Sequence, residues 1–236
     1  MNKSKPALLL YFTASLMYVL SVFFEWDSSV ALLFKPMILP AIYFYYWQES
    51  AFRPTVLSSL ALWLFYIGDM ILLIENHNVQ IPLMLLNLSA YLIVGYYVTK
   101  DLLKIKIPEL SNFLVLIVSL VTAFLVSLLY VALSLVFNAA DPDFGLLTVY
   151  GIVLLLLSLE IFAYYLLKND TSGFFILMTV ISLVISDLFY VLYNYYGQFQ
   201  VFININAICQ VASFYFLVKY FLYKNHYNNN LITDEQ

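Results

Sequence analysis

Long apolar segments alternate with short polar ones along the whole chain. Eight of these segments are long enough to cross the ~30 Å hydrocarbon core of a bilayer as helices. They predict helices over residues 7–24, 28–48, 54–75, 79–98, 111–137, 144–167, 172–194 and 200–223. The segments are apolar on all sides and do not alternate with period two, which favours helices over barrel strands. The pattern therefore predicts an all-α integral membrane protein, a bundle of eight transmembrane helices.

Composition leaves no room for a soluble domain. Of the 236 residues, 64% are hydrophobic and 10% are charged, and the mean hydropathy is +0.91. A water-soluble core cannot bury so large an apolar fraction. We therefore expect a single membrane domain over residues 1–236, with a short polar tail at 224–236. The segments IGDMILL and ISDLFYV, in the third and seventh helices, echo each other in a way that suits a parallel four-plus-four duplication.

The basic residues predict the orientation of the bundle. With eight alternating helices, nine of the ten Lys and Arg residues fall on one side: Lys3, Lys5, Arg53, Lys100, Lys104, Lys106, Lys168, Lys219 and Lys224. The loops on the other side carry only acidic charges: Glu25, Asp27, Glu75, Asp141 and Asp143. Lys and Arg accumulate on the cytoplasmic side of membranes, so an N-in/C-in topology is expected. Helical spans favour a bacterial inner (plasma) membrane over an outer one.

Four ionisable residues fall inside the predicted spans: Lys35, Asp69, Glu160 and Asp187. Such a side chain costs several kcal/mol in the bilayer and is by default a hypothesis of a functional site. From the helical rise per residue, Lys35, Asp69 and Asp187 reach a similar depth, in the half of the bundle away from the basic side. Glu160 lies in the other half, where a structural role near Lys168 is expected.

Further polar side chains share the depth of the two aspartates. They are the amides Asn87, Asn204, Asn206 and Gln210 and the hydroxyl-bearing Tyr91, Ser186 and Tyr190. In one interpretation, Lys35 and Asp69 form a buried ion pair that only holds helices together. In the other, the layer lines a cavity with two unlike carboxyls. Asp69, beside a cation, then stays ionised, and burial keeps Asp187 protonated, which makes an acid and base pair.

Metal, cofactor and nucleic-acid sites are not expected. Cys209 is the single cysteine, and His77 and His226 fall in an outer loop and in the tail, too far apart for one metal cluster. The formal net charge of -4 is spread over loops and tail, with no basic patch for nucleic acid. The expected partner is a membrane lipid.

Three motifs of the polar layer are similar to those of a known family. LFKPMILP, FYIGDMILL and VISDLFYVL resemble the KPL-type, GD and SD motifs of the YhhN-like lysoplasmalogenase family, in the same order. The resemblance implies an eight-helix hydrolase that cleaves the vinyl ether bond of lysoplasmalogens to a fatty aldehyde and a glycerophospho-alcohol, without a cofactor.

The resemblance also suggests roles for the residues of the layer. It matches Asp69 and Asp187 to the family's motif aspartates, and Lys35 and Pro36 to its Lys-Pro. Asp187 is expected to protonate the alkene carbon, while Asp69 stabilises the resulting cation and orients water. The expected substrate-binding residues are Lys35, Asn87, Tyr91, Ser186, Tyr190, Asn206 and Gln210. Lys35 either pairs with Asp69 or binds the phosphate of the lipid.

Two other functions agree with the same residues. A small-molecule or lipid transporter would use Lys35, Asp69 and Asp187 as a relay, and a non-catalytic membrane partner protein would use them for packing. Only an enzyme changes the covalent structure of a bound lipid, and only a transporter needs polar access from both faces. Polar groups concentrate in one half of the predicted bundle, which favours the enzyme.

Overall fold

In the computed structural model, residues 4–74, 80–105, 112–136 and 144–233 are described. They form long helices with the following bounds: α1 Lys5–Phe23, α2 Ser28–Glu49, α3 Val56–Ile74, α4 Gln80–Leu102, α5 Asn112–Val136, α6 Phe144–Lys168, α7 Thr171–Val191, the π-helix η1 Leu192–Tyr196, and α8 Gln200–Thr233. Within the described residues, 8 helices are long and apolar enough to cross a membrane. The prediction of an all-helical protein with eight helices long and apolar enough to cross a membrane is confirmed for these residues. Predicted features at Lys3, Glu75, His77, Lys106, Asp141, Asp143 and the side chain of His226 lie outside the described residues.

Several helices continue beyond the predicted apolar segments. α4 runs to Leu102, α7 passes into η1 as far as Tyr196, and α8 continues through the predicted polar tail to Thr233. Polar residues end a hydrophobic pattern without breaking a helix, because backbone hydrogen bonding along the chain is unaffected by leaving the lipid. The sequence pattern therefore marks where the lipid ends and not where each helix ends.

Side-chain caps begin two of the helices. Asp27 accepts a hydrogen bond from the backbone N–H of Ser29 at 2.9 Å and starts α2, and Asp170 accepts one from Gly173 at 2.7 Å and starts α7. Both satisfy donors that the first helical turn leaves without a partner. Between α6 and α7, Asn169 adopts a positive φ of 44°, a conformation that asparagine tolerates better than most residues. This sharp turn brings α6 and α7 side by side.

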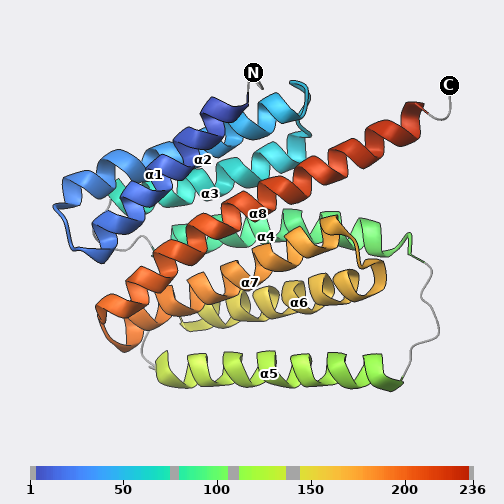
Figure 1. Cartoon of the computed structure of the whole chain (residues 1–236). Helices are drawn as coiled ribbons and strands as arrows, with labels where there is room; N and C mark the ends of the chain where they lie inside the picture. Colours follow the sequence, from blue (N-terminus) through green and yellow to red (C-terminus); the bar gives the residue numbers. More distant parts are fainter. Residues whose placement is uncertain (1–3, 75–79, 106–111, 137–143, 234–236) are drawn as a thin grey trace.

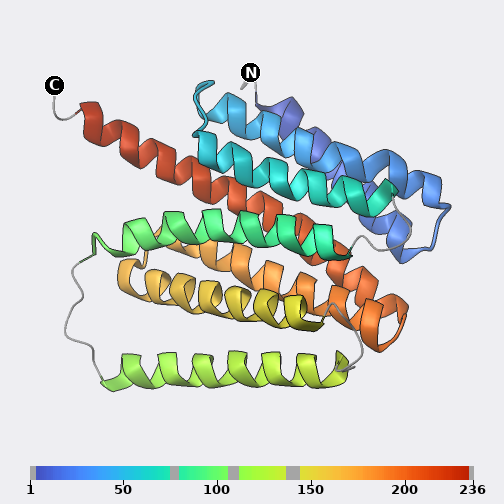
Figure 2. The same ribbon diagram turned by 180° about the vertical axis from the view of Figure 1, so that it is seen from behind.

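Seven helices form a closed ring from which α5 is left out. Neighbour contacts run α1–α2–α3–α4–α6–α7–α8, and α8 packs back against α1 and α2. α4 therefore contacts α6 directly, while α5 lies outside the ring against α6, α7 and η1, at one edge of the bundle (Figures 1 and 2). The most apolar stretch of α5 contains no buried residue. The start of α1 and the end of α8 lie at the same end of the bundle in Figure 1, as an even number of crossings requires.

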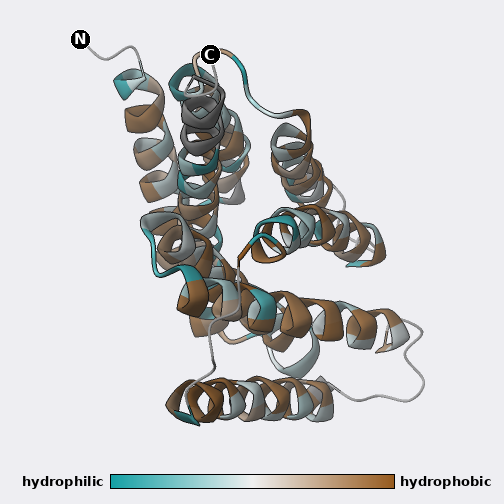
Figure 3. Ribbon diagram, turned by 90° about the vertical axis from the view of Figure 1, so that its right-hand side faces the viewer, coloured by the Kyte–Doolittle hydropathy of each residue, from teal (hydrophilic) through white to brown (hydrophobic). Residues whose placement is uncertain are grey.

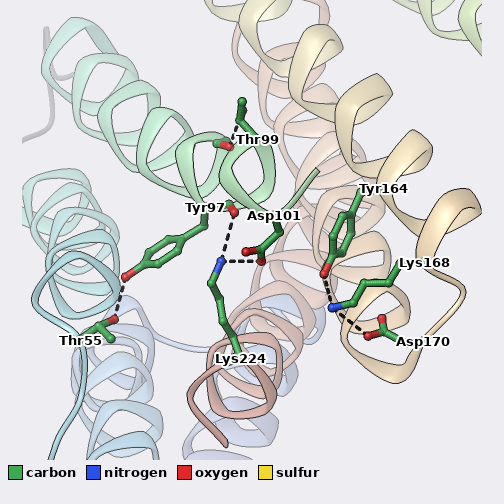
Figure 4. A network of polar contacts seen from close by, with 9 residues as sticks. Thr55, Tyr97, Thr99, Asp101, Tyr164, Lys168, Asp170 and Lys224 are labelled. Carbon is green, nitrogen blue, oxygen red and sulfur yellow. Dashed lines mark hydrogen bonds and ion pairs between the residues drawn. The ribbon is translucent and has the colours of Figure 1, made fainter. Parts of the chain in front are cut away.

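The end of the bundle that holds both termini also holds most basic residues, and we call it the basic end. Lys224 of α8 forms an ion pair with Asp101 of α4 at 2.6 Å and donates to the carbonyl oxygen of Tyr97 at 3.1 Å (Figure 4). Lys168 pairs with Asp170 at 3.0 Å across the turn from α6 to α7. Figure 3 looks onto this end and shows hydrophilic residues at turns and helix ends, with hydrophobic residues along the helices.

Candidate functional site

The predicted polar layer surrounds one cavity of about 40 Å³, which we call the polar cavity. Its wall contains seven of the nine predicted site residues: Asp69, Asn87, Ser186, Asp187, Tyr190, Asn206 and Gln210. The other two lie behind this wall, since Lys35 pairs with Asp69 and Tyr91 donates to Asp187. At ~10–15 Å³ for each water, a cavity of this size holds about three or four water molecules with polar partners.

Asp69 lies on the wall as one half of a buried ion pair. Its Oδ1 is 3.5 Å from Lys35 Nζ and accepts a hydrogen bond from Gln210 Nε2 at 2.7 Å. The side chains of Lys35 and Asp69 are only 6% and 8% exposed, and the ammonium lies over the ring of Tyr18, 5.5 Å from its centroid. Two helices and an amide therefore fix this carboxylate, with the cation on the side away from the cavity.

Asp187 has different surroundings on the opposite wall. Its Oδ2 accepts hydrogen bonds from Tyr91 at 2.5 Å and from Tyr150 at 2.7 Å, and the two phenol oxygens are 3.1 Å apart. The ion pairs of the described residues do not include Asp187. The cavity thus lies between one carboxyl that faces a cation and one that faces only neutral donors.

Tyr150 belongs to this site although it was not among the predicted residues. It is 6% exposed and makes α6 the sixth helix to supply a polar group. In the sequence it is a single tyrosine within the aliphatic run TVYGIVLLLL. A hydroxyl so far from either membrane interface needs a buried partner, and this was the signal that could have identified it.

Other residues of the layer mainly join helices. Asn206 Nδ2 donates to the carbonyl and the hydroxyl of Ser186 at 2.9 and 3.0 Å, and the Ser186 hydroxyl lies 3.4 Å from the Asn206 carbonyl. This pair locks α7 to α8. Asn87 interacts with the Tyr150 hydroxyl, and Tyr190 lies within electrostatic range of both aspartates.

A cluster of aromatic side chains, which we call the aromatic floor, lies between the polar cavity and the basic end. Phe65 and Phe214 lie one helical turn from Asp69 and Gln210, and Tyr91 completes the cluster, with ring centroids 5.8 Å (Phe65–Tyr91) and 5.7 Å (Phe65–Phe214) apart. All three rings are buried. This closed packing separates the cavity from the basic end.

Polar side chains continue from the cavity toward the opposite end. Tyr195 donates to Gln80 Oε1 at 2.6 Å, and Gln200 donates to Asn204 Oδ1 at 3.2 Å. Asn204, which was expected within the layer, lies in this outer group. The cavity therefore has polar surroundings on one side and an aromatic floor on the other.

Glu160 lies apart from the site. It accepts a hydrogen bond from Thr99 of α4. Lys168 instead forms its ion pair with Asp170 and donates to Tyr164 at 2.8 Å (Figure 4). Glu160 thus joins α6 to α4 in the half of the bundle toward the basic end.

Removing one phenol is expected to have a small effect, and removing both a larger one. Tyr150→Phe should lower the free energy of unfolding by about 1 kcal/mol, because Asp187 keeps the bond from Tyr91. The double variant Tyr91→Phe/Tyr150→Phe should lose about 3–4 kcal/mol, more than twice the single loss, because the buried carboxyl then lacks both donors. Denaturation in detergent would measure both, with Tyr130→Phe, at a residue 73% exposed, as the control. Strictly additive losses would contradict this description.

The arrangement offers two carboxyls with unlike neighbours, room for water between them and an aromatic floor. Such a site suits proton transfer in a water-poor environment, where a positioned acid and base act on one bound molecule. Comparisons of the chain with protein-family models, with curated proteins and with solved structures gave no match.

Proposed function

We propose that the chain is a membrane hydrolase that cleaves the vinyl ether bond of lysoplasmalogen-type lipids. The observation that carries this proposal is the polar cavity between Asp69, paired with Lys35, and Asp187, bonded only to phenols. Two neighbouring carboxyls whose surroundings favour different protonation states commonly act as the acid and the base of one reaction. The resemblance of the three motifs to the YhhN-like lysoplasmalogenase family supports the choice of bond.

The reaction needs one proton donor and one water. Asp187 gives its proton to the alkene carbon next to the ether-bearing carbon, which leaves an oxocarbenium ion and a carboxylate. Water adds to the ether-bearing carbon, and its extra proton returns to a carboxylate. The hemiacetal then breaks its bond to the glycerol oxygen, which takes a proton, and the products are a fatty aldehyde and the glycerophospho-alcohol.

Each residue of the site has a role in this scheme. Asp69 stabilises the cation and orients the water, and Lys35 is a positioning residue that keeps Asp69 ionised. Tyr91 and Tyr150 position Asp187 and disperse the charge that it gains after donating its proton.

The same features support an N-in/C-in topology with the cavity in the outer half. The basic end carries the Lys and Arg residues that favour the cytoplasm. The aromatic floor of Phe65, Tyr91 and Phe214 lies between the cavity and this end. A transporter needs a path from both faces, so this floor favours the hydrolase over the transporter.

The test is release of aldehyde by the purified protein in D₂O. Given an alkenyl lysophospholipid, the wild type should form an aldehyde with one deuteron on the carbon next to the carbonyl, because the proton added to the alkene comes from solvent. Asp69→Asn and Asp187→Asn, if folded, should release almost none. The saturated alkyl ether of the same lipid should remain intact, because it has no alkene to protonate.

Two results would contradict this proposal. If the wild type leaves vinyl ether, ester and amide lysolipids unchanged, the hydrolase proposal fails. If it releases fatty acid from the ester but no aldehyde from the vinyl ether, the site is a hydrolase of another bond and the protonation scheme is wrong.

A further inference from the structure

A second cavity, of about 80 Å³, lies between α5 and the pair α6–α7. We call it the apolar cavity, because leucines from all three helices dominate its wall, among them Leu125, Leu129, Leu155 and Leu188. Its shape and lining suit a hydrocarbon and offer almost no partner to a polar ligand.

The two cavities share part of one wall. Tyr150, Asp187 and Val191 line both of them. The hydrogen-bonded Tyr150–Asp187 pair therefore stands between an apolar space on the α5 side and a polar space on the Asp69 side. A molecule that filled both would have to be amphiphilic, with its polar–apolar junction beside Asp187.

The packing of α5 supplies a route from the bilayer. This helix stands outside the ring, contacts α6 more than α7, and has no buried residue in its most apolar stretch (Figures 1 and 2). It also touches η1, and π-helical turns occur often at functional sites. A lipid chain in the membrane thus reaches the apolar cavity sideways, past a single loosely held helix.

Gly151 of α6 sets how closely α5 can approach. A Cβ at this position would lie 2.5 Å from Leu129 Cδ1, so a larger residue here must displace the Leu129 side chain. Both residues line the apolar cavity. Position 151 is therefore the place where added bulk fills the cavity most directly.

We propose that the apolar cavity holds the part of the hydrocarbon chain of a single-chain lipid that lies nearest its polar group, and that the first polar atoms of the lipid lie in the polar cavity, which places the bond between the two parts beside Asp187. The identity of that bond rests on the function proposed above, whereas binding of the chain does not require turnover. Lipid tails are as apolar as leucine, so transfer of the chain from bilayer to cavity gains little affinity. The cavity instead sets the depth to which the chain enters, and thus which bond meets the acid.

A third hollow is larger than the apolar cavity, but it is not beside the aspartates, so volume alone does not identify the binding site of the lipid chain. It lies between α2 and α3, has a volume of about 150 Å³ and is lined by residues such as Leu39, Tyr43 and Trp63. Neither aspartate lies on its wall.

Photolabelling tests this inference without turnover. The probe is an alkyl ether lysophosphatidylethanolamine with a diazirine in mid-chain, which has no alkene to hydrolyse, and the labelled peptides are identified by mass spectrometry. The label that an excess of unmodified alkyl lysolipid removes is expected on residues 125–133, 151–158 and 184–191. Competed label on the α2–α3 hollow, or none within these three segments, overturns the proposal.

Two variants and a matched control sharpen the result. Gly151→Leu and, from the α5 side, Ala132→Phe should each cut the competed label at least about tenfold, the scale on which hydrophobic pockets discriminate size. Gly145→Leu makes the same change on the same helix at a position with nothing within 4 Å, and should label like the wild type. Unchanged labelling in both cavity variants contradicts the assignment.

Measurements of aldehyde release by the wild type and Gly151→Leu distinguish the failure of one proposal from the failure of the other. If both are correct, Gly151→Leu lowers activity toward a long-chain vinyl ether by a much larger factor than activity toward a short-chain one. If the wild type releases no aldehyde, the hydrolase fails while the labelling still decides the chain site. If the wild type is active but Gly151→Leu cleaves all chain lengths as the wild type does, the chain site fails and the hydrolase stands.

Discussion

Asp187→Asn is expected to lower kcat for aldehyde release by about 10²–10⁴-fold, the range that a positioned general acid contributes. Asparagine has nearly the same shape, and its carbonyl oxygen can still accept the bonds from Tyr91 and Tyr150. It cannot, however, give a proton to carbon. The measurement is aldehyde formed per protein molecule at saturating substrate, with the melting temperature recorded beside it.

The matched control is Asp170→Asn. Asp170 is an aspartate at the basic end that caps α7, and asparagine caps a helix about as well. This variant should keep wild-type turnover. An Asp187→Asn protein that folds and retains more than about one tenth of the wild-type kcat would exclude Asp187 as the proton donor.

Lys35→Met is expected to cost about 3–5 kcal/mol of stability, because it leaves the Asp69 carboxylate buried without its cation. Adding Asp69→Asn should recover most of this loss. The amide carries no charge and its oxygen still accepts the bond from Gln210. Denaturation of the single and double variants in detergent gives the coupling energy.

The comparison pair is Lys168–Asp170, whose side chains are 32% and 37% exposed. Lys168→Met should cost at most about 1 kcal/mol, because solvent screens such a pair. If Lys35→Met also costs no more than this, Asp69 is not a buried carboxylate that depends on Lys35. The different surroundings of Asp69 and Asp187 would then no longer support their assignment as base and acid.

Much of the fold could be predicted because lipid imposes simple rules on a chain. Helices must satisfy their own backbone in the bilayer, so each long apolar run predicts one. The same rules make ionisable residues such as Asp69 and Asp187 conspicuous, and a helical rise of ~1.5 Å per residue gives their depth. These calculated depths were enough to predict that most residues of the polar cavity lie in one layer of the bundle.

The rotation and neighbours of each helix were not predictable in this way. Apolar residues occur on every side of α5 and α6, so no stripe in the sequence shows that α4 contacts α6 directly or that α5 stands outside the ring. For the same reason, the sequence could not predict that Tyr150 donates a hydrogen bond to Asp187. Nor could it predict that Lys35 lies on the side of Asp69 away from the polar cavity. These details depend on side-chain packing between helices, which small residues such as Gly151 decide locally.

The wall shared by the two cavities would also decide the fate of the products. In the proposed reaction, cleavage beside Asp187 would leave the aldehyde on the α5 side, next to the bilayer, and the glycerophospho-alcohol on the Asp69 side, toward water. Each methylene holds the aldehyde in the membrane by about 0.8 kcal/mol, so a long chain does not follow its former partner. Recombination would require the two fragments to meet again across a phase boundary, so the proposed arrangement would slow the reverse reaction.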